Sequence, residues 1–374
     1  MIQRAIDLAS LSAPGKAAIL YGPRRAGKTT LLHLYLQSCG MRYRLETGDN
    51  IRMQHLLGSA DMKEILAFAE GYELIAIDEA QQIPGIGIGL KILVDHRPDL
   101  RLIATGSSSF DLAGAVGEPL TGRKRTATLY PLSQLELRAT MNDFDLKEQL
   151  PDFLIYGCYP EVVTAQTRSE RIGYLEELVG SYLLKDILAL ERIKAPRPML
   201  ELLKLVAFQV GSEVSLNELA TQVRLDVKTV ARYLDILEKG FVLVRLGGFS
   251  RNLRNEVTSK AKYYFLDNGI RNAVISQYNQ LDSRNDIGAL WENFLVAERL
   301  KKRAYTAMYG SSYFWRTYAG QEVDYLEEQD GRLSGYEFKW SGKRRRRPPK
   351  SWTEAYPQAD WELVTPDNYQ PFVC

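Results

Sequence analysis

The sequence has few of the residues that build disulfide frameworks and thiolate metal sites. Its 374 residues include three cysteines and three histidines. The cysteines are Cys39, Cys158 and Cys374, which lie far apart and form no CxxC pair. This spacing excludes a disulfide framework and a cysteine-rich zinc site.

Long apolar runs are also missing. No run approaches the ~18 residues of a membrane-spanning helix, so the sequence predicts none and no membrane partner. Residues 1–16 lack the apolar core of a signal peptide, which predicts a cytoplasmic protein. Hydrophobic residues make up 45% and charged residues 25%, which excludes a wholly disordered chain. At ~150 residues per domain, the length predicts two or three domains.

Neither sign of charge is in large excess over the whole chain. Lys and Arg total 48 and Asp and Glu total 46, for a net charge of +2. Residues 343–350 nevertheless hold six positive charges in eight positions. This run has two interpretations, a solvated loop or a loop that contacts nucleic-acid phosphates.

A glycine-rich motif follows the first apolar run. Residues 17–21 predict a buried strand, and residues 30–36 predict an apolar helix. The motif between them matches GxxxxGK[ST], in which backbone N–H groups surround a β-phosphate, the lysine reaches the β- and γ-phosphates and the hydroxyl ligates Mg²⁺. The nucleotide-contacting residues expected from it are Gly22, Pro23, Arg24, Arg25, Ala26, Gly27, Lys28, Thr29 and Thr30.

An acidic pair ends a second apolar strand, expected at residues 74–77. Asp78 is placed to hold the magnesium ion through water, and Glu79 to polarise the attacking water. This division of roles is typical of hydrolysis rather than of binding alone. The alternative is that Asp78 caps a helix.

Two further polar positions are candidates for the same site. Ser107, or its neighbour Ser108, follows a third strand at residues 102–105 and would lie beside the γ-phosphate as a sensor; the alternative is a serine-rich turn. Arg123 precedes a strand at 126–130 and would stabilise transition-state charge, in its own subunit or in a neighbour's site. Its alternative is a surface basic cluster. Action in a neighbour's site would imply a homo-oligomer.

The middle of the chain predicts helices and then a winged helix. Residues 136–205 are compatible with helices and form a connector. Ser215 opens one helix, a second runs from Val227 to Leu237, and two strands follow at 241–244 and 262–265. Lys228, Thr229, Arg232 and Tyr233 of the second helix would face a DNA groove. The alternative is a winged helix used as a lid or interdomain wedge.

The last ninety residues predict a carboxylate cluster. Asp330-Gly331 is a two-residue hairpin signal, and that register places Asp324 opposite Glu337 and Lys339 opposite Glu322. Opposed carboxylates ~5 Å apart repel unless a cation lies between them. A divalent ion is the expected occupant, with Lys339 orienting a water or stabilising a transition state. The alternative is a solvent-facing strand pair with a Lys339–Glu322 salt bridge.

Together, these motifs resemble those of a family of bacterial and archaeal AAA-type P-loop ATPases that carry a C-terminal domain of unknown function. The resemblance rests on the phosphate loop with residues 77–81, and on Gly320-x-Glu322-Val323-Asp324 followed by Glu337-x-Lys339. It implies ATP as the nucleotide and a C-terminal fold similar to PD-(D/E)XK nucleases. In that fold Asp324, Glu337 and Lys339 match the metal-site residues. Glu292 matches the helical acidic residue, which would contribute to the metal ion directly or through water. Arg123 is similar to the arginine position of that ATPase group.

The expected architecture is α/β, in four parts. They are a P-loop AAA-type ATPase domain at 1–135, a helical connector at 136–205, a winged helix at 206–275 and a PD-(D/E)XK nuclease-like domain at 285–374. The expected function is an ATPase that acts on DNA, with Mg²⁺-dependent phosphodiester cleavage, aided by a second Mg²⁺ or Mn²⁺, as an output. The alternative function is an NTP-gated regulatory or binding protein whose nuclease-like domain is inactive.

Overall fold

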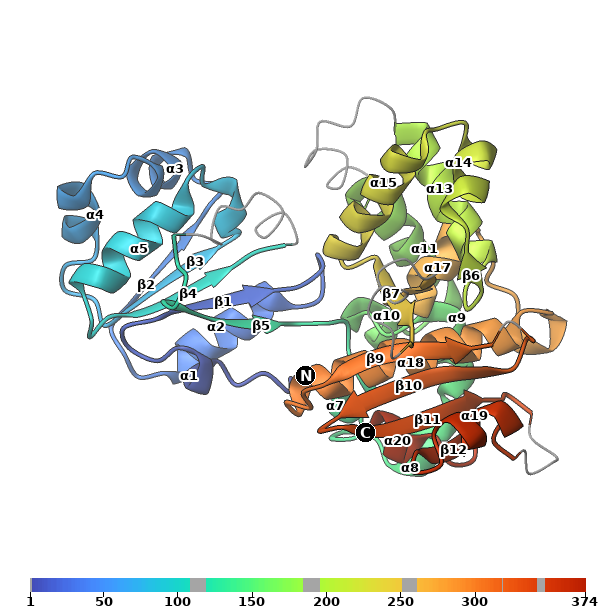
Figure 1. Ribbon diagram of the computed structural model, residues 1–374. Coiled ribbons are helices and arrows are strands. Elements are labelled where there is room, and N and C mark those ends of the chain that lie inside the picture. The colour runs from blue at the N-terminus through green and yellow to red at the C-terminus, as the bar shows by residue number, and fades with distance from the viewer. Residues whose placement is uncertain (1, 108–118, 184–195, 251–260, 318, 342–346) are drawn as a thin grey trace.

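The computed structural model shows two parts that lie side by side and are joined by the segment that follows the first sheet (Figure 1). No helix in the described part of the chain is both long and apolar enough to cross a membrane. The residues that the structure describes are 2–107, 119–183, 196–250, 261–317, 319–341 and 347–374.

The first part is built on a five-stranded sheet. Its strands are β1 (Ala17–Tyr21), β2 (Tyr43–Thr47), β3 (Leu74–Asp78), β4 (Arg101–Thr105) and β5 (Lys124–Thr128). All neighbours are parallel, in the order β2-β3-β4-β1-β5. The predicted α/β class with a parallel sheet is therefore confirmed. The parallel arrangement brings the carboxyl ends of all five strands to the same edge.

Alternating side chains of β1 explain why helices cover both faces of this sheet. Ala18 and Leu20 pack in one cluster with Leu32 of α2, whereas Ile19 belongs to the cluster that contains Leu90 of α5. The helices of this part are α1 (Leu8–Leu11), α2 (Lys28–Ser38), α3 (Ile51–Gly58), α4 (Met62–Phe68), the 3₁₀ turn η1 (Ala80–Gln82) and α5 (Ile86–His96).

Short helices follow β5, in agreement with the helix-compatible pattern of the connector. Ser133 caps the first of them and Thr167 caps another, each with a reciprocal glutamate bond. These helices are α7 (Gln134–Leu137), α8 (Asp143–Glu148), α9 (Leu150–Tyr156), α10 (Pro160–Thr164), α11 (Arg168–Glu177), the π-helix η2 (Leu178–Leu183) and α13 (Pro196–Phe208).

The predicted helix pair lies next along the chain. Ser215 accepts a hydrogen bond from Glu218 N at the start of the first helix, and Gly240 follows the second. Strands then pair antiparallel beside it. These elements are β6 (Glu213–Val214), α14 (Leu216–Val223), α15 (Val227–Lys239), β7 (Leu243–Gly248) and β8 (Ala261–Phe265).

The strands of the helix pair join those of the C-terminal segment in a single seven-stranded sheet. Its order is β12-β11-β10-β9-β7-β8-β6, and β7 pairs with β9 in parallel. The sheet therefore crosses the boundary expected between 206–275 and 285–374. The remaining elements are α17 (Asn268–Val274), the 3₁₀ turn η3 (Leu281–Ser283), α18 (Ile287–Tyr305), β9 (Ser311–Arg316), β10 (Glu322–Gln329), β11 (Arg332–Phe338), α19 (Lys350–Ala355), β12 (Asp360–Val364) and α20 (Gln370–Val373).

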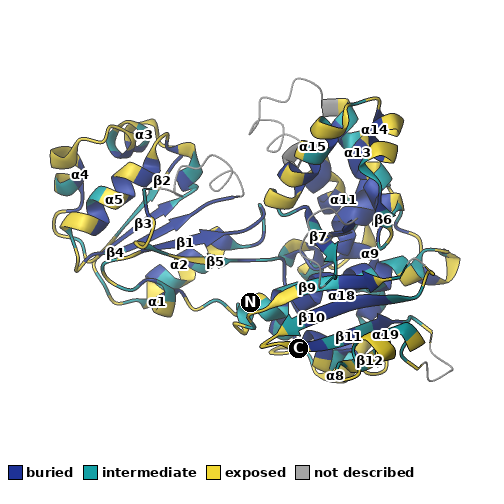
Figure 2. Ribbon diagram, in the orientation of Figure 1, coloured by how far each residue is buried: buried dark blue, intermediate teal, exposed yellow. Residues whose placement is uncertain are grey.

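Buried side chains form the centre of both parts (Figure 2). A large apolar cluster at the centre of the second part contains residues from the connector, the helix pair and the C-terminal segment, such as Leu154, Leu234 and Phe294. Burial at ~25 cal/mol per Å² of apolar surface thus binds these three segments into one body.

Candidate active sites

The glycine-rich loop lies between β1 and α2, as the motif predicts. Gly22 has φ +148°, and a Cβ at this position would lie 2.1 Å from the carbonyl oxygen of Leu129. The neighbouring exit of β5 thus requires a glycine there. Lys28 is buried, and its Nζ donates to the carbonyl oxygens of Gly22 (2.8 Å) and Pro23 (3.0 Å). The ammonium is thereby held at the mouth of the loop, where a phosphate would lie.

Thr29 and Asp78 meet at the carboxyl edge of the first sheet. Thr29 Oγ1 donates to Asp78 Oδ2 at 2.7 Å, although the residues are 49 positions apart. The other carboxylate oxygen of Asp78 accepts a hydrogen bond from Thr105, at the end of β4. A hydroxyl and a carboxylate that converge beside a phosphate loop are oxygen donors of the kind that Mg²⁺ prefers, so the residues fit this ion.

Glu79 follows directly in a left-handed conformation, with φ 48°. Its N–H donates to Thr105 Oγ1 at 3.3 Å, and its carboxylate accepts a hydrogen bond from Gln81. Asp78 is not the cap of a regular helix here, because it is the last residue of β3 and Glu79 precedes the 3₁₀ turn. The carboxylate of Glu79 is therefore held at the same edge as Thr29 and Asp78.

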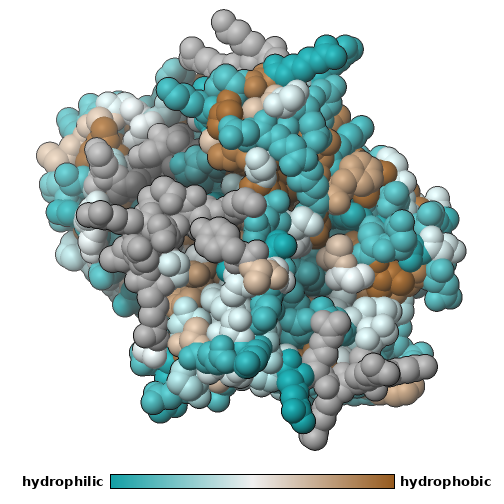
Figure 3. Space-filling model, turned by 45° about the vertical axis from the view of Figure 1, so that its right-hand side comes forward, coloured by the Kyte–Doolittle hydropathy of each residue, from teal (hydrophilic) through white to brown (hydrophobic). Residues whose placement is uncertain are grey.

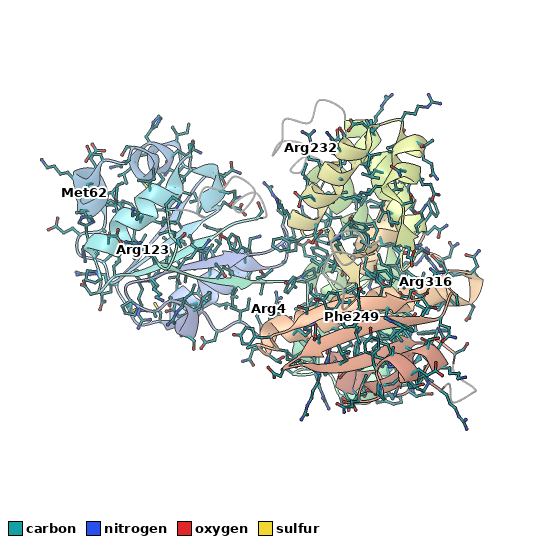
Figure 4. All side chains as sticks on the ribbon, viewed as in Figure 1. Arg4, Met62, Arg123, Arg232, Phe249 and Arg316 are labelled. Atoms are coloured by element: carbon teal, nitrogen blue, oxygen red, sulfur yellow. The ribbon has the colours of Figure 1, made fainter. Side chains whose placement is uncertain are left out.

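The two remaining candidates of this site differ in their placement. Ser107 is buried two residues beyond β4, at the loop edge of the sheet. Ser108 lies outside the described residues. Arg123 lies at the opposite edge, because its carbonyl accepts from Ala17 N at the start of β1, about 17 Å of strand away from the loop. Its Nε contacts Asp95 Oδ1 at 2.5 Å (Figure 4). Action of Arg123 in its own subunit's site does not fit this placement. Action in a neighbour's site and the alternative, a surface basic cluster, both stay predictions.

Three family models match successive parts of the chain. One described as "AAA domain" matches residues 14–138, which contain the loop and the first sheet. Two described as domains of unknown function match residues 147–281 (DUF8612) and 287–369 (DUF4143).

Two curated relatives match most of the chain. The uncharacterized proteins Rv2008c of Mycobacterium tuberculosis and Mb2031c of Mycobacterium bovis are each 30% identical to this chain over 326 residues, which cover 86% of this chain and 69% of theirs. The chain belongs to their family. Its first part is an AAA domain, the ATP-binding unit of a P-loop ATPase.

Among solved structures, AMPPCP-bound DnaA from Aquifex aeolicus is similar at 18% identity, over 63% of this chain and 85% of that one. The TM-score of that match is 0.27, which is too low to support an inference about this chain.

The phosphate loop of the AAA domain also contacts the second part of the molecule. Arg25, with φ 59°, pairs through Nη2 with Glu177 Oε1 of α11 at 2.8 Å and lies 5.2 Å above the ring of Tyr174. Arg4 donates to the carbonyl of Ala26 at 2.6 Å and pairs with Glu136 of α7 at 2.8 Å (Figure 4). The loop is thus tied to α11, outside the AAA match, and through Arg4 to α7 at the end of that match.

The C-terminal hairpin has the register that its turn predicts. Tyr325 pairs with Tyr336, and Asp330 and Gly331 both have positive φ, at 50° and 76°. The backbone N–H of Phe338 donates to Asp324 Oδ2 at 2.8 Å, which holds this carboxylate next to Glu337. The pairing of β9 with β10 shifts register across Asp324, an irregularity that re-aims side chains.

Asp324, Glu337 and Lys339 line a cavity of about 540 Å³. Lys339 Nζ lies 2.9 Å from Glu337 Oε1 and 3.9 Å from Asp324 Oδ2. Asp324 and Glu337 are buried, so the solvent-facing alternative is wrong. Burial, with the charges of Glu292 and Glu337, raises the pKa of Asp324 to about 7. The basic residues Arg347 and Lys350 lie at the same cavity.

Glu292 comes from α18 and is held by other partners. Its Oε1 accepts a hydrogen bond from Tyr264 at 2.7 Å and lies 3.2 Å from Lys262 Nζ. Lys262 Nζ also lies 2.5 Å from Glu322 Oε1, so the Lys339–Glu322 bridge of the alternative is replaced by Lys262–Glu322. Within the described ranges, no group of three or more His, Cys, Asp or Glu residues is arranged to hold a metal ion. Glu292, which we expected to contribute to the metal ion directly or through water, is held here by Tyr264 and Lys262. Asp324 and Glu337 fit Mg²⁺, which commonly uses one or two carboxylates and keeps waters.

The predicted DNA-contacting residues are partly described. Lys228 and Arg232 are exposed on α15, and Figure 4 labels Arg232 there. The prediction that Tyr233 faces DNA is wrong, because its side chain is buried in the core. Most of the coloured surface in Figure 3 is hydrophilic, with scattered apolar patches. Of the basic run, residues 343–346 lie outside the described residues, and so do the cations at 251, 254 and 260.

Sequence reasoning missed the roles of three residues at these sites. Thr105 was visible as a polar residue at the end of an apolar strand, the signal that had been assigned to Ser107. Arg25 was treated only as a loop position, and its ion pair depends on a helix 152 residues away. Lys262 gave no signal, because one lysine in a strand usually points to solvent.

Proposed function

We propose that this protein is an ATP-hydrolysing switch. The observation that supports it most is the convergence of Thr29, Asp78 and Thr105 beside the phosphate loop. Thr29 and Asp78 would hold Mg²⁺, which supplies charge neutralisation of the phosphates when bound. Lys28 would exchange its two carbonyl contacts for phosphate oxygens, and Glu79 would orient and deprotonate the attacking water. Phosphate release from ATP by the purified chain tests the proposal, and Lys28→Ala should abolish it.

The switch would pass its state to the second part through Arg25. The arginine belongs to the loop that receives the phosphates, and its partners Glu177, Tyr174 and Glu161 belong to the connector. A triphosphate beside the loop competes with Glu177 for the guanidinium, because both are anions within reach of one side chain. Binding of ATP would therefore loosen the contact between the AAA domain and α11.

Glu177→Gln should strengthen ATP binding about two- to fivefold, because a partly exposed ion pair is worth on the order of 0.5–1 kcal/mol. Titration with a fluorescent ATP analogue measures the affinity. When Glu177→Gln is made in the Arg25→Ala variant, the ATP affinity should not change further. Glu201→Gln, at an exposed site on α13, serves as the matched control. Equal affinities of wild type and Glu177→Gln would show that the pair does not oppose ATP.

The target of the switch would be DNA. Lys228 and Arg232 project from α15 without burial, and Arg347 and Lys350 add positive charge elsewhere on the second part. Asp235 and Glu238 also lie exposed on α15, so the helix would touch phosphates mainly through its first turns. Cations placed in this way give sequence-independent affinity for the backbone.

Duplex binding should weaken steeply as salt rises. Each phosphate contact contributes about −0.9 to the slope of log affinity against log salt, so Lys228→Ala/Arg232→Ala should make the slope shallower by about 2. Fluorescence anisotropy at several salt concentrations measures it. The control Lys63→Ala/Lys91→Ala removes two exposed charges of the AAA domain. A slope that changes equally in both double variants would remove α15 from the interface.

The second candidate function is Mg²⁺-dependent phosphodiester cleavage at the C-terminal cavity. It is favoured by one observation, the convergence of Asp324, Glu337 and Lys339 beside the cations Arg347 and Lys350. The two carboxylates would hold the ion, Lys339 would stabilise charge on the phosphate, and the two outer cations would bind the strand. Plasmid nicking with Mg²⁺ or Mn²⁺ tests it, and its absence would leave the NTP-gated binding protein as the function.

A further inference from the structure

Lys262 is a charged side chain in a place where charge is costly. Its side chain is 2% exposed, and its Nζ lies 2.5 Å from Glu322 Oε1 and 3.2 Å from Glu292 Oε1. Burial by itself lowers the pKa of a lysine, but Glu292 and Glu322 outweigh it and raise the pKa of Lys262. The ammonium therefore stays charged and bridges two carboxylates that would otherwise repel each other.

The bridge joins two segments of different family matches. Lys262 lies on β8, within the 147–281 match, whereas both glutamates lie within the 287–369 match. Tyr264 adds a second contact from β8 to Glu292. Gly211 lies close to Glu292 on another side, because a Cβ on Gly211 would lie 3.1 Å from the carboxylate of Glu292. Glu292 is thus enclosed by groups that precede the C-terminal segment.

The charged groups of this region form two sets, one that lines the cavity and one beside it that reaches the cavity through Glu322. Lys339 faces Asp324 and Glu337, at the open side that Arg347 and Lys350 border. Lys262 faces Glu292 and Glu322, with Arg316 4.0 Å from Glu322 at the margin (Figure 4). Both Oε1 atoms contact one ammonium nitrogen, so they lie no more than about 6 Å apart. Two carboxylates at that separation bind either a cation or a proton.

We propose that Lys262 is a fixed internal cation, which occupies the position of a divalent metal ion between Glu292 and Glu322 and limits this cavity to one divalent ion, at Asp324 and Glu337. The single divalent ion at Asp324 and Glu337 rests on the proposed cleavage function. The role of Lys262 between Glu292 and Glu322 does not. The consequence is that the cavity would use one metal ion together with two lysines, in place of a pair of metal ions.

The test counts Mn²⁺ ions bound by the full chain, using electron paramagnetic resonance of free Mn²⁺ without nucleotide. All variants carry Asp78→Asn, which removes the carboxylate of the ATP site. The parent should bind one ion, and Lys262→Met should bind two, because removal of the ammonium leaves Glu292 and Glu322 to a metal. Lys301→Met is the matched control, since Lys301 is an equally buried lysine paired with Glu298. It should bind one ion, like the parent.

Further variants keep the two proposals apart. Lys262→Gln retains hydrogen-bond donors and should also gain an ion, so it replaces Lys262→Met if that variant fails to fold by circular dichroism. Asp324→Asn should remove the parent's ion but not the ion gained at Glu292 and Glu322. No gain in either Lys262 variant would overturn the role of Lys262, whatever the parent binds. If the parent binds no Mn²⁺ and Lys262→Met binds one ion, the role of Lys262 stands. The proposed metal-dependent cleavage at Asp324 and Glu337 would then be wrong.

Discussion

Glu79→Gln should bind ATP with the affinity of the wild type and hydrolyse it about 10²- to 10⁴-fold more slowly. The loss is that of a general base, because glutamine keeps the size of the side chain and its bond with Gln81 but cannot take a proton. Lys28 and Thr29 are unchanged, so the phosphates and Mg²⁺ are still held. Binding is measured by titration with labelled ATP and turnover by phosphate release.

Lys28→Ala is the comparison that separates binding from chemistry. It removes the buried ammonium and should lower ATP affinity about 100-fold or more, since charge-assisted bonds are worth ~1.5–3 kcal/mol each. The assignment of Glu79 would be overturned by turnover equal to wild type, and the assignment of the loop by undiminished binding in Lys28→Ala.

Asp324→Asn should make the protein more stable at pH 8 and flatten the dependence of its stability on pH. The pKa of Asp324 is about 7 in the fold against an ordinary value of 3.8, so the folded state holds a proton that the unfolded state has lost. The contribution of Asp324 to the free energy of unfolding therefore falls as pH rises from 4 to 7. The difference between the two pKa values corresponds to on the order of 4 kcal/mol. Asparagine carries no charge and still accepts the bond from Phe338 N.

Thermal and urea unfolding between pH 5 and 8, in a chelator, measure this effect. Asp330→Asn, the same change in the turn of the same hairpin, is the control and should leave the profile unaltered. A profile of Asp324→Asn that runs parallel to that of the wild type would show that Asp324 is ionised throughout this range. The same variant should abolish any cleavage while ATP turnover continues, because the AAA domain shares no residue with the cavity.

Local patterns were sufficient to place the glycine-rich loop and to set the register of the C-terminal hairpin. The glycine-rich motif lies between its strand and its helix, as the motif predicts, and the close approach of Leu129 shows why position 22 is a glycine. The register of the hairpin followed from Asp330 and Gly331, since a two-residue turn with positive φ at both positions fixes every later pair.

Long-range contacts explain what the sequence could not predict. The bridge of Lys262 requires β8 to lie against α18 and β10, and that depends on the parallel pairing of β7 with β9, which no local pattern encodes. Arg123 was misplaced for a different reason. It precedes its strand, and in a parallel sheet the residues before a strand lie at the edge away from the phosphate loop.

The central claim is that the AAA domain hydrolyses ATP with residues of its own loop and strand ends. The most direct measurement is release of labelled phosphate from ATP by purified wild type, with Mg²⁺ and after removal of Mg²⁺ by chelation, beside Glu79→Gln. We expect steady release that requires Mg²⁺ and is almost absent in Glu79→Gln. Release that persists equally in Glu79→Gln or without Mg²⁺, or wild type that binds ATP and releases none, would contradict the account.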